Sequence, residues 1–149
     1  MKSKEIKENI GNVFSKEEKK SLLTKLIFCG KNTKVVNVHD FVFTLKTLSE
    51  KENRKVVEVL LKAPENERLS YVRAVTLAFS IDEINEIPFL EVVKEKAGDA
   101  FENDEDFILR TKIEIVLCLQ NNVVTKIFEG YESLIKDTKE SLDEKEIKN

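Results

Sequence analysis

Few residues in this 149-residue sequence have a type and spacing that could carry chemistry. His39 is the only histidine, and Asp40 beside it is the one adjacent acid that could support a general base. The two cysteines, Cys29 and Cys118, lie far apart among apolar neighbours, which predicts buried, reduced thiols. A zinc site needs three or four ligands at set spacing, and these residues do not offer them. We therefore expect His39 to be a solvated turn residue.

Two further kinds of site can be tested against the sequence. The acids between Asp99 and Asp106 resemble a calcium loop in charge, but the twelve-residue order with a central glycine and a terminal glutamate is missing. The four glycines are scattered singly, so no loop of the phosphate-binding kind is formed. We expect no catalytic residue, no metal site and no cofactor, and hence a protein that is not an enzyme.

The charge is unevenly distributed around a formal net value of -3. Residues 82–106 hold ten acids and two lysines, whereas residues 1–81 are mildly basic. The basic residues are too dilute for the clustered footprint that nucleic acid requires, so we expect no nucleic-acid partner. The acidic block has two readings: a solvated surface, or a docking surface for a basic partner.

Membrane segments are also not expected. The longest apolar run, Ile115 to Leu119, has five residues, far fewer than a bilayer-spanning helix needs. The first ten residues, MKSKEIKENI, carry charge where a signal peptide needs an apolar stretch. We therefore expect neither a membrane partner nor export.

The elements that must position any site are mostly helical, because only four glycines and two prolines are present. Ile6, Ile10 and Val13 predict a helix over 3–13, and a capping box at Ser15 opens a second helix that reaches Phe28. The next helix, over 50–63, begins at a second capping box that starts with Ser49. The remaining helices are expected at 65–80, 89–98, 103–119 and 123–135, with a loop over 82–88.

A β-hairpin is predicted between the second and third of these helices. Residues 34–38 and 41–45 are rich in β-branched and aromatic residues and are separated by His39-Asp40, the length of a two-residue turn. Asp40 tolerates the positive φ that such a turn needs, and Gly30 can take the left-handed position that ends the preceding helix.

The fold class is therefore mainly α (α+β): a small helical domain of about five to seven helices with one β-hairpin in its N-terminal half. We expect an N-terminal helical extension over 1–30, a helical core domain over 31–135 with its hairpin at about 34–46, and a flexible charged tail over 136–149. The 65–80 helix is expected to be central and most buried, with Leu69 on its inward stripe.

The last helix offers the candidate binding residues. Val124, Phe128, Tyr131 and Ile135 recur at helical spacing. Core packing is the default explanation of such a stripe. The alternative is an apolar ridge that packs against a helix of a partner protein.

Three segments together resemble a known family. They are VNVHDFVFTLKTLSEKE (36–52), ERLSYVRAVTLAFSI (67–81) and NVVTKIFEGYESL (122–134). In their order they resemble tail assembly chaperones and related tail or baseplate-hub assembly proteins of double-stranded DNA bacteriophages. The resemblance covers about residues 34–135; the glycine usual after the second segment is missing from Asp82 to Ile87.

The resemblance implies a non-enzymatic protein that binds a tape-measure protein or a baseplate-hub component during tail assembly. It implies a place in the host cytoplasm, and possible retention in the virion tail. A stable structural subunit of the tail, neck or baseplate is the alternative, and an unrecognised enzyme or regulator is a third. The sequence leaves open whether the protein forms a homo-oligomer.

Overall fold

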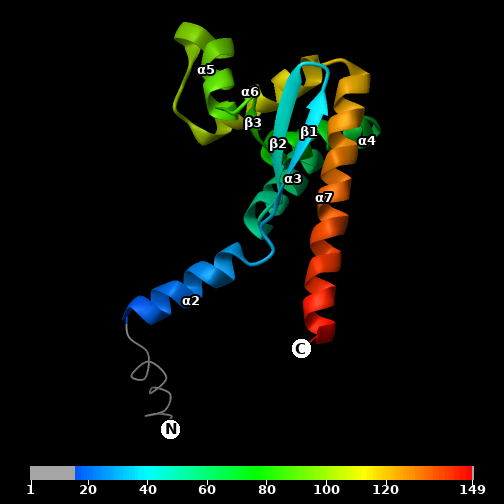
Figure 1. Ribbon diagram of the computed structural model, residues 1–149. Coiled ribbons are helices and arrows are strands. Elements are labelled where there is room, and N and C mark those ends of the chain that lie inside the picture. Colours follow the sequence, from blue (N-terminus) through cyan, green and yellow to red (C-terminus); the bar gives the residue numbers. More distant parts are fainter. Residues whose placement is uncertain (1–15, 149) are drawn as a thin grey trace. The chain divides into compact units, whose positions relative to one another are not determined.

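The computed structural model describes residues 16–148, with side chains described over residues 21–143 (Figure 1). The chain divides into two compact units, Met1–Gly30 and Lys31–Asn149. The described part of the first unit is helix α2, Lys16–Phe28. Gly30 beyond it has a φ of 81°, as the sequence predicts for a helix end. The helix expected over 3–13 and the cap at Ser15 lie outside the described residues.

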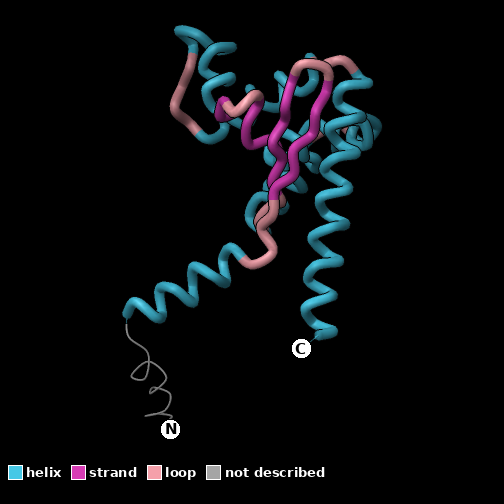
Figure 2. The backbone as a smooth tube through the Cα atoms, viewed as in Figure 1, coloured by secondary structure: helices cyan, strands magenta, loops and turns pink. Residues whose placement is uncertain are grey.

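The second unit combines helices with one antiparallel sheet, which confirms the predicted mainly α (α+β) class (Figure 2). Its sheet has the strand order β1-β2-β3-β4. The elements in chain order are β1 (Thr33–Val38), β2 (Phe41–Lys46), α3 (Glu50–Lys62), η1 (Glu65–Glu67), α4 (Arg68–Ser80), β3 (Ile81–Ile84), β4 (Ile87–Pro88), α5 (Phe89–Ala97), η2 (Gly98–Ala100), α6 (Glu105–Cys118) and α7 (Asn121–Lys148).

The predicted hairpin is present as β1 and β2, joined at His39-Asp40. The positive φ of the turn, 55°, falls on His39 rather than on Asp40, which corrects the expectation. Phe43 and Leu45 are buried on the inner face, while Phe41 on the same face is half exposed at the tip. The inner face of the hairpin must therefore pack against helices.

A second hairpin, β3–β4, replaces the loop expected over 82–88. Its turn residues Asn85 and Glu86 both have positive φ, 53° and 67°, the geometry that tight hairpins need. Asn85 also holds β2: its Oδ1 accepts from the Val42 N–H at 2.7 Å, and its own N–H donates to the Val42 carbonyl at 2.7 Å. These non-local bonds order a segment that is too short to show a strand pattern in the sequence.

Helix α4 is the central helix of this unit, as predicted, and it contacts α3, α6 and α7. Its residues from Ala74 to Ala78 are all buried. Leu69, however, is 87% exposed, because the helix begins only at Arg68 and its first turn lies outside the core. The inward stripe therefore starts about one turn later than the sequence suggested.

Helix α7 covers the β1–β2 hairpin (Figure 1). Gly130 lies so close to Val36 that a Cβ at position 130 would overlap the Val36 side chain. The helix then continues to Lys148, which corrects the expectation of a flexible tail from residue 136. Good helix formers without a breaker extend it, and Thr138 is buried, where it accepts a hydrogen bond from Asn32 Nδ2 at 2.9 Å.

Helix α6 begins at Glu105, two residues later than the start expected at residue 103. Its N-cap is Asp104, whose carboxylate accepts from the Phe107 N–H at 3.1 Å, and Asn103 before it is also of a capping type. Either residue type favours this position, so the sequence alone could not choose between neighbours.

Candidate interaction surface

The four residues expected to form a ridge on the last helix share one stretch of α7, but most of them face the core. Val124 is buried, and Phe128 and Tyr131 pack against the core with their ring centroids 5.8 Å apart. Only Ile135 is exposed, at 39%. Core packing, the default explanation of this stripe, therefore holds for Val124, Phe128 and Tyr131, because this part of α7 packs against the hairpin and α4.

Exposed apolar side chains gather instead on α2. We define the α2 stripe as its five large apolar residues, whose exposed fractions lie between 53% and 68%: Leu22, Leu23, Leu26, Ile27 and Phe28. The first four follow the i, i+4 spacing that places side chains on one side of a helix. The sequence predicted a helix that reaches Phe28, and the structure confirms it.

Two residues at the α2 stripe carry polar or reactive groups, an ammonium and a thiol. Lys25 lies within it and is exposed, and Cys29 follows it. Both cysteines, Cys29 and Cys118, are exposed free thiols, which corrects the expectation that they are buried. Apolar neighbours in the sequence misled here, because Leu26, Phe28 and Leu117 are exposed as well.

A second exposed apolar set occurs at the junction of α3 and α4. We define the corner patch as Val57, Leu61 and Leu69, which are 49%, 63% and 87% exposed. Val57 and Leu61 lie one turn apart on α3. The Arg68 guanidinium donates to the Leu61 carbonyl at 3.1 Å and its Nε to the Ala63 carbonyl at 3.2 Å, which holds the start of α4 against the end of α3.

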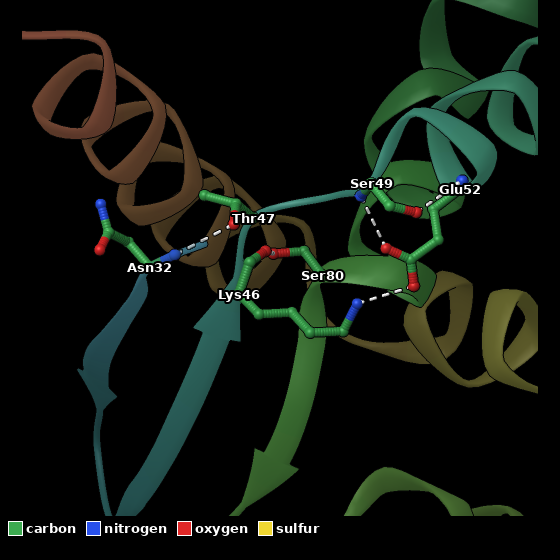
Figure 3. A network of polar contacts seen from close by, with 6 residues as sticks. All are labelled: Asn32, Lys46, Thr47, Ser49, Glu52 and Ser80. Atoms are coloured by element: carbon green, nitrogen blue, oxygen red, sulfur yellow. Dashed lines mark hydrogen bonds and ion pairs between the residues drawn. The ribbon is translucent and has the colours of Figure 1, made fainter. Parts of the chain in front are cut away.

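A polar network lies at the base of the hairpin (Figure 3). Lys46 Nζ pairs with Glu52 Oε2 at 2.8 Å, and Glu52 Oε1 accepts from the Ser49 N–H at 2.9 Å. Ser49 Oγ accepts in return from the Glu52 N–H at 3.1 Å, so the predicted capping box is formed. Buried Ser80 donates its Oγ–H to the Lys46 carbonyl at 2.8 Å. The network joins β2, α3 and α4.

Ionisable groups from other elements lie around this network. Burial lowers the pKa of Lys112, nearby Lys46 lowers it further, and Asp82 and Glu52 oppose them. Its ammonium lies 5.3 Å from the centroid of the Phe89 ring, a cation–π contact that favours the charged form. A lysine with a lowered pKa can act as a nucleophile. Here Lys112 and Lys46 lie near the carboxylates of Asp82 and Glu52, so their charges balance, as in a structural ion-pair network.

Two more groups at the same polar network have shifted pKa values. Burial opposes ionisation of Glu52, but hydrogen bonds from Lys46 and Ser49 outweigh it and lower the pKa below its usual value. Burial raises the pKa of Tyr131, and the negative charge of Glu52 adds to that effect. Both shifts involve Glu52 of α3, which pairs with Lys46 of β2 and acts on Tyr131 of α7.

Other candidate sites are not assembled within the part of the chain that the structure describes. No three His, Cys, Asp or Glu residues gather there closely enough to hold a metal ion. Within residues 16–148, no helix has the length and apolar character needed to cross a bilayer. His39 is exposed at its turn, and Asp99 and Glu102 are exposed between α5 and α6.

Comparisons with protein-family models, with curated proteins and with solved structures gave no match to this chain.

Proposed function

We propose that this protein is a non-enzymatic assembly protein of a bacteriophage tail that binds the tape-measure protein or a baseplate-hub component as a chaperone. The observation that carries the proposal is the α2 stripe, five large apolar side chains that are each more than half exposed. Apolar surface of this kind marks sites of protein–protein contact. The resemblance of the hairpin and of two helices to tail assembly proteins supplies the identity of the partner.

The mechanism is transient cover of a long, aggregation-prone helical partner. The α2 stripe lies along a helix, and an amphipathic helix of the partner would pack its own apolar face against it. Burial of apolar area contributes about 25 cal/mol per Å², so a few large side chains give a contact that forms and also releases. The protein would act in the host cytoplasm during tail assembly.

The acidic block supports the same proposal by a different route. Its carboxylates include Asp99 and Glu102, which are exposed between α5 and α6. Such charges raise the rate at which a basic segment of a partner is encountered, more than they raise affinity. We infer that the acidic block steers the partner and that α2 holds it.

Co-expression with the tape-measure protein of the same phage tests the proposal. The wild-type protein should co-elute with that partner and raise its soluble fraction, and Leu22→Glu or Leu26→Glu should abolish both effects. Ile135→Glu is the matched control, since Ile135 is the one exposed member of the α7 set. Binding that survives both α2 substitutions, or no co-elution of the wild type, would contradict the proposal.

The alternative role, a stable subunit of the tail, neck or baseplate, makes a different prediction. Mass spectrometry of purified particles would then find the protein in stoichiometric amounts, whereas a chaperone would be absent or present in traces. The α2 stripe fits both roles, since a permanent subunit also buries apolar surface against its neighbours.

A further inference from the structure

We propose that two copies of the chain pair through the open edge of β1, so that their sheets join into one antiparallel sheet across a two-fold axis at Val35. The sheet has the order β1-β2-β3-β4, so β1 and β4 are its two edges. All residues of this sheet belong to the second unit.

The backbone groups of β1 alternate between bonding β2 and pointing away from it. Val38 and Phe41 flank the two-residue turn and form the first hydrogen-bonded pair, and bonded and non-bonded pairs alternate from there. Val42, on the other strand, confirms this phase, because its N–H and carbonyl bond Asn85 on the side away from β1. The residues whose N–H and carbonyl groups point away from β2 are Thr33, Val35 and Asn37.

This edge of β1 is uncovered. Thr33, Val35 and Asn37 are all exposed, Val35 to 55%. Within the part of the chain that the structure describes, no hydrogen bond reaches their outward backbone groups. Helix α7 packs on the face that carries Val36, against Gly130, and leaves these in-plane groups without a partner. An open edge of six residues is a template for a further strand.

The opposite edge of the sheet is protected. Strand β4 has only two residues, and the second is Pro88, which has no N–H to donate. Strand β1 has neither a proline nor a bulge in its pairing with β2. Its one charge, Lys34, lies on the face of Val36 and is 3.7 Å from Asp137 of α7. Since β4 cannot accept a strand, the only described edge that can pair with β1 is the β1 edge of a second copy.

The β1 edge is complementary to itself. Its three outward positions are symmetric about Val35, so two antiparallel copies place Val35 opposite the second copy's Val35 and Thr33 opposite the second copy's Asn37. Each of these pairs exchanges two hydrogen bonds. On the sheet surface they give an apolar pair and two polar pairs, and Lys34 lies opposite a valine rather than a like charge. A register shifted by two residues would leave an outward residue unpaired, so the symmetric register is favoured and closes the pair as an isologous dimer.

Charges at position 35 test both the pairing and its register, by the mass measured with light scattering after size exclusion. Wild-type protein at tens of micromolar should be a dimer. Val35→Lys and Val35→Glu each place like charges opposite each other across the axis, so each should raise the dissociation constant about tenfold or more. An equimolar mixture of the two variants places opposite charges there and should recover dimers with one chain of each kind. Leu117→Lys, at a similarly exposed residue on α6, is the matched control and should remain a dimer.

A second pair of variants tests the backbone bonds. The Val35 N–H points away from β2, so Val35→Pro removes a donor at the axis but none from the β1–β2 ladder. Val35→Thr keeps that donor and the β-branched shape. We expect Val35→Pro to be a monomer with the circular dichroism spectrum of the wild type, and Val35→Thr to remain a dimer. If Val35→Pro does not fold, the charge mixture alone decides.

A monomeric wild type, a dimer that survives Val35→Lys, or a mixture of the two charge variants that stays monomeric would overturn the pairing. The first result is also the one expected if this edge takes a strand of another protein. The pairing does not use the α2 stripe, so it can fail independently of the proposed function. Leu26→Glu should lose the tape-measure partner and remain a dimer, whereas Val35→Lys should be a monomer that still binds that partner.

Discussion

Gly130 of α7 lies directly against Val36 of β1, and a Cβ at position 130 would overlap Cγ2 of that valine. The contact lets α7 approach the hairpin more closely than any other residue would allow, because glycine alone has no side chain to place there. We expect Gly130→Ala to destabilise the fold by about 1–3 kcal/mol, the usual effect of overpacking. The free energy of unfolding in urea measures it.

A double-mutant cycle identifies the cause of that loss. If the Gly130→Ala defect comes from overlap with Val36, then Val36→Ala should relieve much of it, and the two substitutions should couple favourably. Strictly additive losses would show that the cost at position 130 arises elsewhere in the helix.

The capping box of α3 can be separated from its ion pair. Glu52→Gln keeps a side chain that can bond the Ser49 N–H but removes the charge that pairs with Lys46. We expect it to cost less than Glu52→Ala, which loses both and should destabilise by about 1–2 kcal/mol. Equal losses from the two variants, measured by urea unfolding, would contradict this assignment.

The same glutamate gives a pH dependence. Its folded pKa is lowered below the ordinary value of 4.5, so its contribution is complete above that value and is lost as the pH falls through the folded pKa. The difference in unfolding free energy between wild type and Glu52→Gln should therefore shrink below about pH 4.5. A difference that stays constant from pH 7 to pH 3 would show that charge has no part in it.

Lys112 and Lys46 should respond differently to the loss of their charge. Burial penalises the Lys112 ammonium, so Lys112→Met should leave stability within about 1 kcal/mol of wild type at pH 7 or increase it. Lys46→Met removes the partner of Glu52 and should destabilise. Because the folded pKa of Lys112 is lowered, raising the pH through its titration favours the folded state in wild type but not in Lys112→Met.

The end of α7 contributes to stability through two residues beyond Ile135. Thr138 accepts from Asn32, and Asp137 lies 3.7 Å from Lys34. Truncation after Lys136 should lower the thermal midpoint by several degrees, whereas truncation after Asp143 should change it little. Equal midpoints for both truncations would show that the last turns have no structural role.

The sequence predicted those features whose causes are local. The Ser49–Glu52 capping box lies within four residues, and the two-residue turn at His39-Asp40 separates two runs of strand-forming residues, so both were visible. The second hairpin was missed because its order depends on bonds between Asn85 and Val42, which are far apart in the sequence.

The candidate site was predicted less well than the fold. Both the α2 stripe and the α7 set have helical apolar spacing, and only the packing around them decides which is exposed. The sequence pattern placed the candidate binding residues on α7, whereas Val124 and Tyr131 of α7 pack in the core and the leucines of α2 are exposed. Spacing identifies a face of a helix, but not what covers it.

The exposed thiol of Cys29, directly after α2, is a site for a fluorescent label that reports on the surroundings of α2. Cys29 follows Phe28 directly, and Cys118 lies on a different helix of the second unit. An environment-sensitive dye on Cys29, in a chain with Cys118→Ser, would change its emission whenever anything covers α2. A dye on Cys118 alone would register only changes in the second unit. Comparing the two labelled chains therefore separates binding at α2 from unfolding of the second unit.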